Sequence, residues 1–387
     1  MKTEEQQRRE QISTRVVFFI AGFGMAAWAP LVPYAKARAG IDDGMLGLLL
    51  LCLGAGSMVA MPVAGAVAAR WGCRVAIVGS TLIAAGALPL LATMSSFPLL
   101  AGALLLFGAG MGSLDVTMNM QAVMVERESG RTMMSGFHGL FSVGGFAGAA
   151  GITGLFALGA SPWLAVLGVG LGMVVALALA GPHLLSYGSK SDGPAFALPH
   201  GIVLFLGTLC FILFLTEGAV LDWSAVFLVS VHGMKASLAG LGYTAFAVTM
   251  TVGRLTGDWF VRRFGPVRMV AFGGLCAAAG LLLATLVPSW EVALLGYALV
   301  GAGCSNIVPV LFSATGRQTV MPESVAIPAI ATLGYAGILV GPAGIGLIAK
   351  VASLPVAFGM VAAMLVGVAF SARWLGEGGG RKESGGV

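Results

Sequence analysis

Apolar runs of about twenty residues or more recur along nearly the whole chain, with short polar stretches between them. A helix needs about 20 apolar residues to cross a hydrocarbon core roughly 30 Å thick, and its backbone polar groups must be paired within the segment. The sequence therefore predicts an all-α integral membrane protein with twelve spans. We place them at 14–36, 44–68, 75–93, 97–123, 132–158, 161–181, 199–229, 236–260, 268–287, 290–314, 322–348 and 352–374.

Composition and motifs exclude several other classes of protein. Only 10% of the residues are charged, whereas a soluble domain has about a quarter, so the chain has too little polar surface for a water-soluble globule. The five cysteines show no paired or metal-type spacing, so we expect no disulfide, metal or cofactor. No nucleotide-binding loop, zinc-protease motif or nucleophile elbow occurs, so no catalytic residue is assigned and an enzyme is not expected.

The basic residues define an orientation. With both termini in the cytoplasm, 17 of the 21 Lys and Arg residues lie on the inner side, as the positive-inside rule requires. We therefore predict a multi-pass membrane protein with cytoplasmic termini. A polar stretch between the sixth and seventh spans divides the chain into a bundle at 1–181, a linker at 182–198, a bundle at 199–376 and a tail at 377–387.

The two predicted bundles repeat each other in sequence. Basic residues surround a glycine after the second span (70–74) and after the eighth (263–268), and Gly-Ala-Gly occurs in the fourth span (108–110) and the tenth (301–303). A parallel six-plus-six repeat is typical of secondary transporters, which bind substrate near the midplane. Glycines at near one-turn spacing in the fifth and eleventh spans further predict close helix contacts.

The segment Gly65–Arg74 resembles the loop signature of the major facilitator superfamily, in which a Gly and an acid precede Arg-x-Gly-Arg-Arg. Ala69 stands where the acid is expected, and Cys73 replaces an Arg. The matching segment 253–265 retains its acid, Asp258, and its basic residues. Further stretches resemble the YbjJ-like bacterial branch, related to the fucose and hexose permeases: Trp28–Pro33, Asp115–Asn119, Gly136–Gly145, Glu217–Ser224 and Gly334–Pro342.

This resemblance covers nearly the whole chain. It implies a rocker-switch secondary transporter of twelve helices in a bacterial inner membrane, with a cavity lined mainly by the first, fourth, seventh and tenth spans. The substrate does not follow from the resemblance.

Three of the sixteen acidic residues fall within predicted spans, namely Asp115, Glu217 and Asp222. An intramembrane carboxylate is expensive and marks a functional site by default. We assign proton coupling to Glu217 and Asp115, although an interhelical hydrogen bond would also explain Asp115. Asp222 follows Glu217 by five residues, which is about 140° around a helix, so with Trp223 it is assigned to a gate at the helix end.

Candidate substrate-binding residues are polar or aromatic side chains within the spans. Trp28 would stack on a sugar ring or fill space, and Asn119 lies one turn from Asp115 on the same face. His138 sits near a helix start, where an inner gate or a packing role is equally consistent. The remaining candidates are Asn306 and Tyr335.

Charges at the inner ends of the helices are expected to form a gate, or latch. Exposed ion pairs contribute only about 0–1 kcal/mol each, which is enough to shift two states of similar energy. The missing acid at Ala69 predicts that the first half of the latch is weaker. The latch residues are Arg70, Arg74, Glu126 and Arg131 in the first half, and Arg254, Asp258, Arg262 and Arg263 in the second.

The combined interpretation is a monomeric secondary active transporter that couples a small sugar-like solute to protons. Its other partner is the lipid bilayer, and no nucleic acid is expected. Nineteen methionines leave open proton-driven efflux of amphipathic drug-like compounds, because methionine suits adaptable pockets. A membrane sensor that transports nothing is the alternative from another class.

Overall fold

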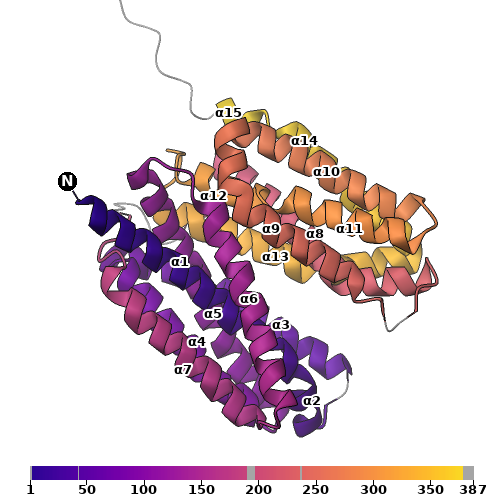
Figure 1. Cartoon of the computed structure of the whole chain (residues 1–387), viewed down its shortest axis with the longest axis horizontal. Coiled ribbons are helices and arrows are strands. Elements are labelled where there is room, and N and C mark those ends of the chain that lie inside the picture. The colour runs from indigo at the N-terminus through magenta and orange to yellow at the C-terminus, as the bar shows by residue number, and fades with distance from the viewer. Residues whose placement is uncertain (1, 42, 190–196, 236–237, 378–387) are drawn as a thin grey trace, which may run out of the picture. The chain divides into compact units, whose positions relative to one another are not determined.

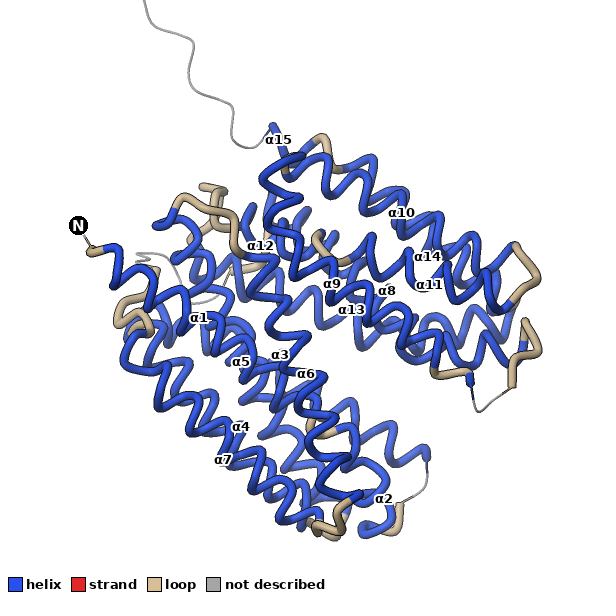
Figure 2. Tube along the Cα trace, in the orientation of Figure 1, coloured by secondary structure: helices blue, strands red, loops and turns tan. Residues whose placement is uncertain are grey.

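The computed structural model describes residues 2–41, 43–189, 197–235 and 238–377. This part of the chain is helical, and no strand occurs in it (Figure 2). The first half contains α1 (Glu4–Ala26), η1 (Ala29–Leu31), α2 (Val32–Ala39), α3 (Asp43–Trp71), α4 (Cys73–Thr93), α5 (Phe97–Ser129), α6 (Met134–Ala157), α7 (Pro162–Ala180) and η2 (Gly181–His183). The second contains α8 (Gly201–Ser230), α9 (Leu241–Phe264), α10 (Pro266–Leu286), α11 (Trp290–Cys304), α12 (Ile307–Thr315), α13 (Glu323–Val351), α14 (Leu354–Ser371) and α15 (Trp374–Glu377).

Eleven helical segments of the described chain are long and apolar enough to cross a membrane. The remaining expected span, 236–260, corresponds to α9, which has 24 residues and is therefore about 36 Å long. Arg254 and Asp258 lower its apolar character. The twelve-span, all-α fold class is confirmed, and α9 is the span whose polar residues need partners.

The chain divides into two compact units. The N-terminal unit comprises Met1–Arg131, Phe137–Leu198 and Pro322–Thr332. The C-terminal unit comprises Thr132–Gly136, Pro199–Met321 and Leu333–Val387. The first residues of α6 thus group with the C-terminal unit, and the first residues of α13 group with the N-terminal unit.

Each unit repeats the internal packing of the other. In the N-terminal unit α5 packs on α3 and α4, and α4 also lies beside α7 (Figure 1). In the C-terminal unit α11 packs on α9 and α10, and α10 also packs on α14. In both units, the fourth span contacts the second and third spans, and the third span contacts the sixth span. A parallel repeat predicts this equivalence.

Glycines explain why the equivalent helices can approach closely. A Cβ at Gly108 would overlap the carbonyl oxygen of Leu53 in α3, and one at Gly301 would overlap that of Phe246 in α9. The second glycine of each Gly-Ala-Gly faces the other neighbour, α4 or α10. The turns that follow α3 and α9 also match, because Gly72 and Gly265 adopt φ values of +90° and +82°, a region that favours glycine.

We expect Gly108→Ala to destabilise the protein by about 1–3 kcal/mol, because the new methyl group would force α3 and α5 apart. Gly102 lies in the same helix, and a Cβ added there would meet nothing within 4 Å, so Gly102→Ala is the matched control. That control should be neutral or stabilising by roughly 0.5–1 kcal/mol, since Ala is the better helix former. Unfolding of both variants in detergent measures the difference, and equal stabilities would contradict the close approach.

The close contacts expected in the fifth and eleventh spans are present with one exception. Gly144 and Gly148 in α6 face backbone atoms of Phe19 and Phe23 in α1. Gly337 in α13 faces the equivalent helix of the second unit, α8, in the same way. A Cβ at Gly151 would meet nothing within 4 Å, although Gly151 lies on nearly the same face of α6 as Gly144. The partner helix α1 ends at Ala26, so one-turn spacing in one helix does not by itself predict a contact.

Candidate membrane-embedded site

The polar pair expected in the fourth span lies in α5. The Nδ2 group of Asn119 donates to the backbone carbonyl of Asp115 at 2.8 Å, so it does not engage the Asp115 carboxylate. The Oδ1 atom of Asn119 is buried and accepts no hydrogen bond. Asp115 is half-buried and pairs with no cation among the residues that the structure describes. Side-chain oxygens of two residues on α5 therefore have no hydrogen-bond donor among the described residues.

Trp28 and His138 occupy different positions in the N-terminal unit. Trp28 precedes η1 and is 6% exposed, and its Nε1–H donor is buried without an acceptor. This places an aromatic side chain with an unused donor near the end of α1. The imidazole of His138, in α6, lies 5.2 Å from the ring of Phe18. That contact supports the packing role considered for His138.

Glu217 in α8 forms an ion pair in the C-terminal unit. The guanidinium Nη2 of Arg254, in α9, donates to Glu217 Oε1 at 3.2 Å. The side chains of Glu217 and Arg254 are only 20% and 9% exposed. The sequence places Arg254 among the latch residues, but the structure places it on the face of α9 that packs against α8. Since an arginine is always charged, Glu217 supplies a counter-charge for it within the membrane span.

Other candidates in this unit have structural partners. Asn306 lies between α11 and α12, and its Nδ2 donates to the Gly253 carbonyl at 3.1 Å and to Ser305 Oγ at 2.9 Å. Its Oδ1 is buried and unpartnered. Tyr335 packs edge-on against Phe214 at 6.2 Å. Asn306 therefore joins the helix break to α9, while one acceptor remains unused.

The second acid of α8, Asp222, lies on another face from Glu217. Asp222 is exposed, in agreement with the rotation of about 140° that five residues give. Trp223 is half-buried, and a Cβ at Gly346 would lie 3.0 Å from its ring. Because α8 continues to Ser230, these two residues lie about two turns before the helix end, where the sequence predicted the end itself. Their gating role stays a prediction.

The two arginines of the first signature loop have contacts within their own unit. Arg74 donates from Nε and Nη2 to the carbonyl of Leu184, at 3.1 and 2.9 Å. The guanidinium of Arg70 lies 5.1 Å from the Trp71 ring centroid. Arg74 therefore binds main-chain oxygen, whereas the sequence predicts a carboxylate partner for it.

The end of α5 carries the other latch residues of the first half. Glu126 lies in the last turn of α5 and Arg131 follows the helix, and the carbonyls of both accept from Ser129 Oγ. The neighbouring Arg127 forms an ion pair with Glu323 of the same unit. Sequence reasoning missed this pair, because its two members are almost two hundred residues apart.

Asp258 in the C-terminal unit binds a helix start. Its two carboxylate oxygens accept from the backbone N–H groups of Ser135 at 3.0 Å and Gly136 at 3.1 Å. An acid at a helix N-terminus satisfies donors that have no partner within the helix and complements the helix dipole. The acid retained in the second signature thus caps α6, a role that a search for ion pairs does not predict.

Two further latch arginines, Arg262 and Arg263, lie in the last turn of α9. Arg262 donates to the Thr132 carbonyl at 3.4 Å, and Arg263 is exposed. Cations at a helix C-terminus complement the helix dipole, so both positions are electrostatically favourable for the helix itself.

Among the described residues, no group of three or more His, Cys, Asp or Glu is arranged to hold a metal ion. The five cysteines, all of them among the described residues, form no disulfide.

Comparison with known proteins places this arrangement in a family. No family model matches the sequence. An uncharacterised MFS-type transporter of Yersinia pestis is 54% identical over 365 residues, covering 94% of this chain and 95% of the relative. The chain belongs to the major facilitator superfamily. As a member of this superfamily it is a multi-pass membrane transporter and not an enzyme.

Solved structures support the same fold at low sequence identity. The fucose:proton symporter FucP of E. coli superposes with a TM-score of 0.78 at 18% identity, covering 94% of this chain and 98% of that one. The proton:xylose symporter XylE gives a TM-score of 0.74 at 14% identity, covering 96% of this chain and 96% of that one. At these identities the likeness establishes the MFS fold alone.

Proposed function

We propose that this MFS transporter couples the movement of a small sugar-like solute to that of protons, by alternating access. The ion pair between Glu217 and Arg254 carries the proposal. Glu217 is a carboxylate within a membrane span that can take up a proton, and its partner is a cation that cannot lose one. Protonation of Glu217 would remove the carboxylate charge that Arg254 contacts at 3.2 Å, so the proton and the conformation of α8 and α9 are energetically linked.

The unsatisfied polar atoms of α5 and of the segment after α1 support a hydroxylated substrate. Buried polar atoms in native proteins are nearly always hydrogen-bonded, so the unpartnered Asn119 Oδ1 and Trp28 Nε1 call for an explanation. A sugar or polyol hydroxyl can donate to the first and accept from the second. Asp115 adds an acceptor on the same helix as Asn119. The two sugar:proton symporters with the same fold support this substrate class.

The remaining assignments follow from this function. The protein acts as a monomer in the bacterial inner membrane with both termini in the cytoplasm, and its two bundles correspond to 1–181 and 199–376. Asp258 and the ion pair of Arg127 with Glu323 serve as inner latches, and Asp222 with Trp223 serves as the outer gate. His138, Asn306 and Tyr335 remain secondary candidates for substrate contact.

Proton flux in proteoliposomes tests the coupling. Fucose, xylose and a panel of other sugars and polyols are first screened by thermal shift, and a sugar that stabilises the protein becomes the transport probe. Glu217→Gln should abolish sugar-driven proton movement, because the amide cannot titrate, yet retain sugar exchange across the vesicle. Glu291→Gln is the control, since Glu291 is an exposed acid bonded to Ser289.

Two outcomes would contradict the proposal. Proton movement that survives both Glu217→Gln and Asp115→Asn would refute the coupling assignment. Stabilisation by lipophilic cations and by no sugar would favour drug efflux.

A further inference from the structure

The chain that leaves α7 is fastened to the N-terminal unit over residues 182–188, which we call the strap. The Arg74 side chain donates to the carbonyls of Pro182, at 2.5 Å, and Leu184. The backbone N–H of Arg74 donates to the Leu185 carbonyl at 2.8 Å, and that of Cys73 to the Tyr187 carbonyl at 3.2 Å. The first turn of α4 thus gives the strap donors that would otherwise lack partners at a helix start.

A second set of bonds ties the strap to α5 and α1. The Leu185 N–H donates to Gln121 Oε1 at 3.2 Å, and Gln121 Nε2 donates to Thr14 Oγ1 at 3.0 Å. Thr14 Oγ1 in turn donates to the Glu10 carbonyl at 2.8 Å. Gln121 and Thr14 have no exposed surface. Buried, fully used polar groups of this kind fix one arrangement, because any other would leave them unpaired.

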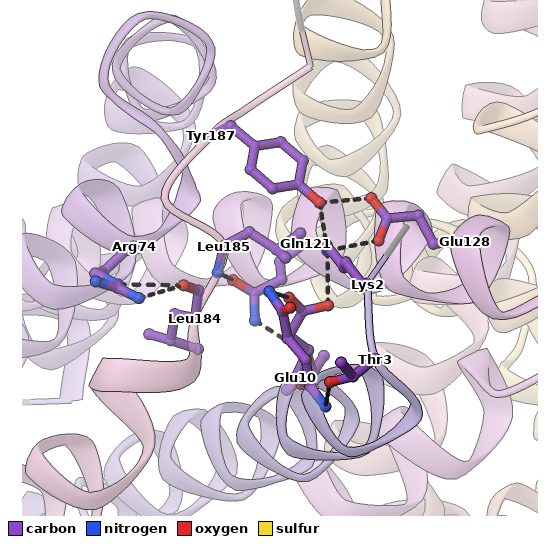
Figure 3. Close-up of polar contacts among 11 residues, drawn as sticks. Lys2, Thr3, Glu10, Arg74, Gln121, Glu128, Leu184, Leu185 and Tyr187 are labelled. Atoms are coloured by element: carbon purple, nitrogen blue, oxygen red, sulfur yellow. Dashed lines mark hydrogen bonds and ion pairs between the residues drawn. The ribbon is translucent and has the colours of Figure 1, made fainter.

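Lys2 links α1, α5 and the strap by hydrogen bonds, as Figure 3 shows. Its Nζ donates to Glu10 at 2.8 Å, to Glu128 at 2.7 Å and to the Tyr187 hydroxyl at 2.7 Å. The Tyr187 hydroxyl also donates to Glu128 at 2.5 Å. Partial burial opposes the charge of Lys2, but these hydrogen bonds outweigh it and raise the pKa of Lys2. Burial and the bond to Glu128 raise the pKa of Tyr187. The Lys2 cation therefore persists at neutral pH.

Two glycines let the strap lie against the loop between α3 and α4. A Cβ at Gly72 would overlap the carbonyl oxygen of Ser186, and one at Gly188 would overlap that of Ala68. The same Cβ at Gly188 would lie 3.1 Å from the Cα of Ala69. Ala69 is where the superfamily signature has its acid. The strap therefore covers the position of the missing acid.

We propose that the segment Gly72–Arg74, which forms the turn after α3 and the start of α4, is the anchor of the linker between α7 and α8, in place of the gating role expected from its signature. The anchor makes the strap a fixed part of the N-terminal unit. The chain that connects the strap to α8 is then 189–200, about twelve residues with a reach of at most roughly 40 Å. Lys2, through its bond to the Tyr187 hydroxyl, joins the start of α1 to the strap.

Hydrogen–deuterium exchange of the full-length protein in detergent tests the anchor. Arg74→Lys removes the forked donor, and we expect exchange of the amides at 183–188 to rise on the order of tenfold, as local opening becomes easier. Arg38→Lys is the matched control, because Arg38 also donates from Nε and Nη2 to two carbonyls, those of Met94 and Leu91, at the opposite end of α4. Unchanged exchange at 183–188 in Arg74→Lys would overturn the proposal. Tyr187→Phe, a smaller change, should produce a rise confined to the strap.

An insertion experiment locates the fixed part of the linker. Four Gly/Ser residues inserted after Ser189 should leave the exchange of 183–188 unchanged, whereas the same insertion after Leu184 should abolish its protection. Loss of protection from both insertions, or from neither, would overturn the boundary. These readouts need no substrate, so their failure is distinct from failure of the transport proposal.

Discussion

Replacing Glu217 with Leu is expected to lower the free energy of unfolding by about 3 kcal/mol, the lower part of the range for breaking a buried ion pair. Arg254 would remain charged, because a guanidinium does not lose its proton inside proteins, and it would have lost the carboxylate that it contacts at 3.2 Å. The 20% exposure of the Glu217 side chain lets water offset part of the cost. Thermal or denaturant unfolding in detergent measures the effect.

The double variant distinguishes a lost charge partner from lost packing. Arg254→Met alone should cost less than Glu217→Leu, because Glu217 without Arg254 can take up a proton whereas Arg254 without Glu217 cannot shed one. Combining the two substitutions should restore most of the stability, since apolar replacement of a buried pair is often neutral. Transport coupled to protons should nevertheless remain absent. If the two losses simply add, the side chains do not interact as the structure indicates.

An exposed ion pair supplies the matched control for this experiment. Glu5 and Arg9 are paired one turn apart in α1, with side chains that are 72% and 54% exposed. Glu5→Leu changes the same residue type but should alter stability by no more than about 1 kcal/mol. The difference between the two Glu→Leu variants then measures the effect of burial.

The sequence was sufficient to predict the spans and the repeat, because both depend on properties that are read along one helix. Apolar length marks each span, and the two Gly-Ala-Gly segments face equivalent neighbours, as their matching positions suggest. The start of α1 at Glu4 lies ten residues before the predicted start at 14. Polar residues such as Arg8 and Arg9 conceal a helix that continues beyond the apolar run.

The pairing of Arg254 was not predictable in the same way. Counting basic residues by side assigns Arg254 to the inner loops, although it lies ten residues before the end of α9, which is about 15 Å along the axis. Its partner is on another helix, and the rotation of two helices about their axes is not encoded in either pattern alone. The available signal for a buried ion pair was an arginine well inside a predicted span. Glu217, an acid within another span, was a candidate partner for it.

The contacts of Arg74 could not be predicted from residue types at all. Its acceptors are main-chain carbonyls of Pro182 and Leu184, and every residue has such a group. The search for a charged partner therefore pointed to Glu126 and missed the strap. The absence of an acid at Ala69 was the useful clue, since it showed that this loop departs from the superfamily pattern.

Asp115→Asn is expected to weaken binding of the transported sugar by about 10- to 100-fold, the equivalent of losing a hydrogen bond to a charged group. The substitution keeps the shape of the side chain and replaces one acceptor oxygen with a donor. Binding is measured by the thermal shift of the purified protein at increasing concentrations of the sugar that the screen identifies. Glu291→Gln, an exposed acid on another helix, serves again as the control.

The stability of the Asp115→Asn protein without sugar separates a binding role from a structural one. The Asp115 carboxylate has no hydrogen-bond partner among the described residues, so its replacement removes no contact and reduces the cost of a charge within a span. The unfolding temperature should stay the same or rise, in contrast with the large loss expected for Glu217→Leu. A clear fall, with sugar binding unchanged, would mean that Asp115 serves an interhelical bond and would remove it from the site. If Asp115 binds the substrate, the Asp115→Asn protein should be stable and should bind the sugar poorly.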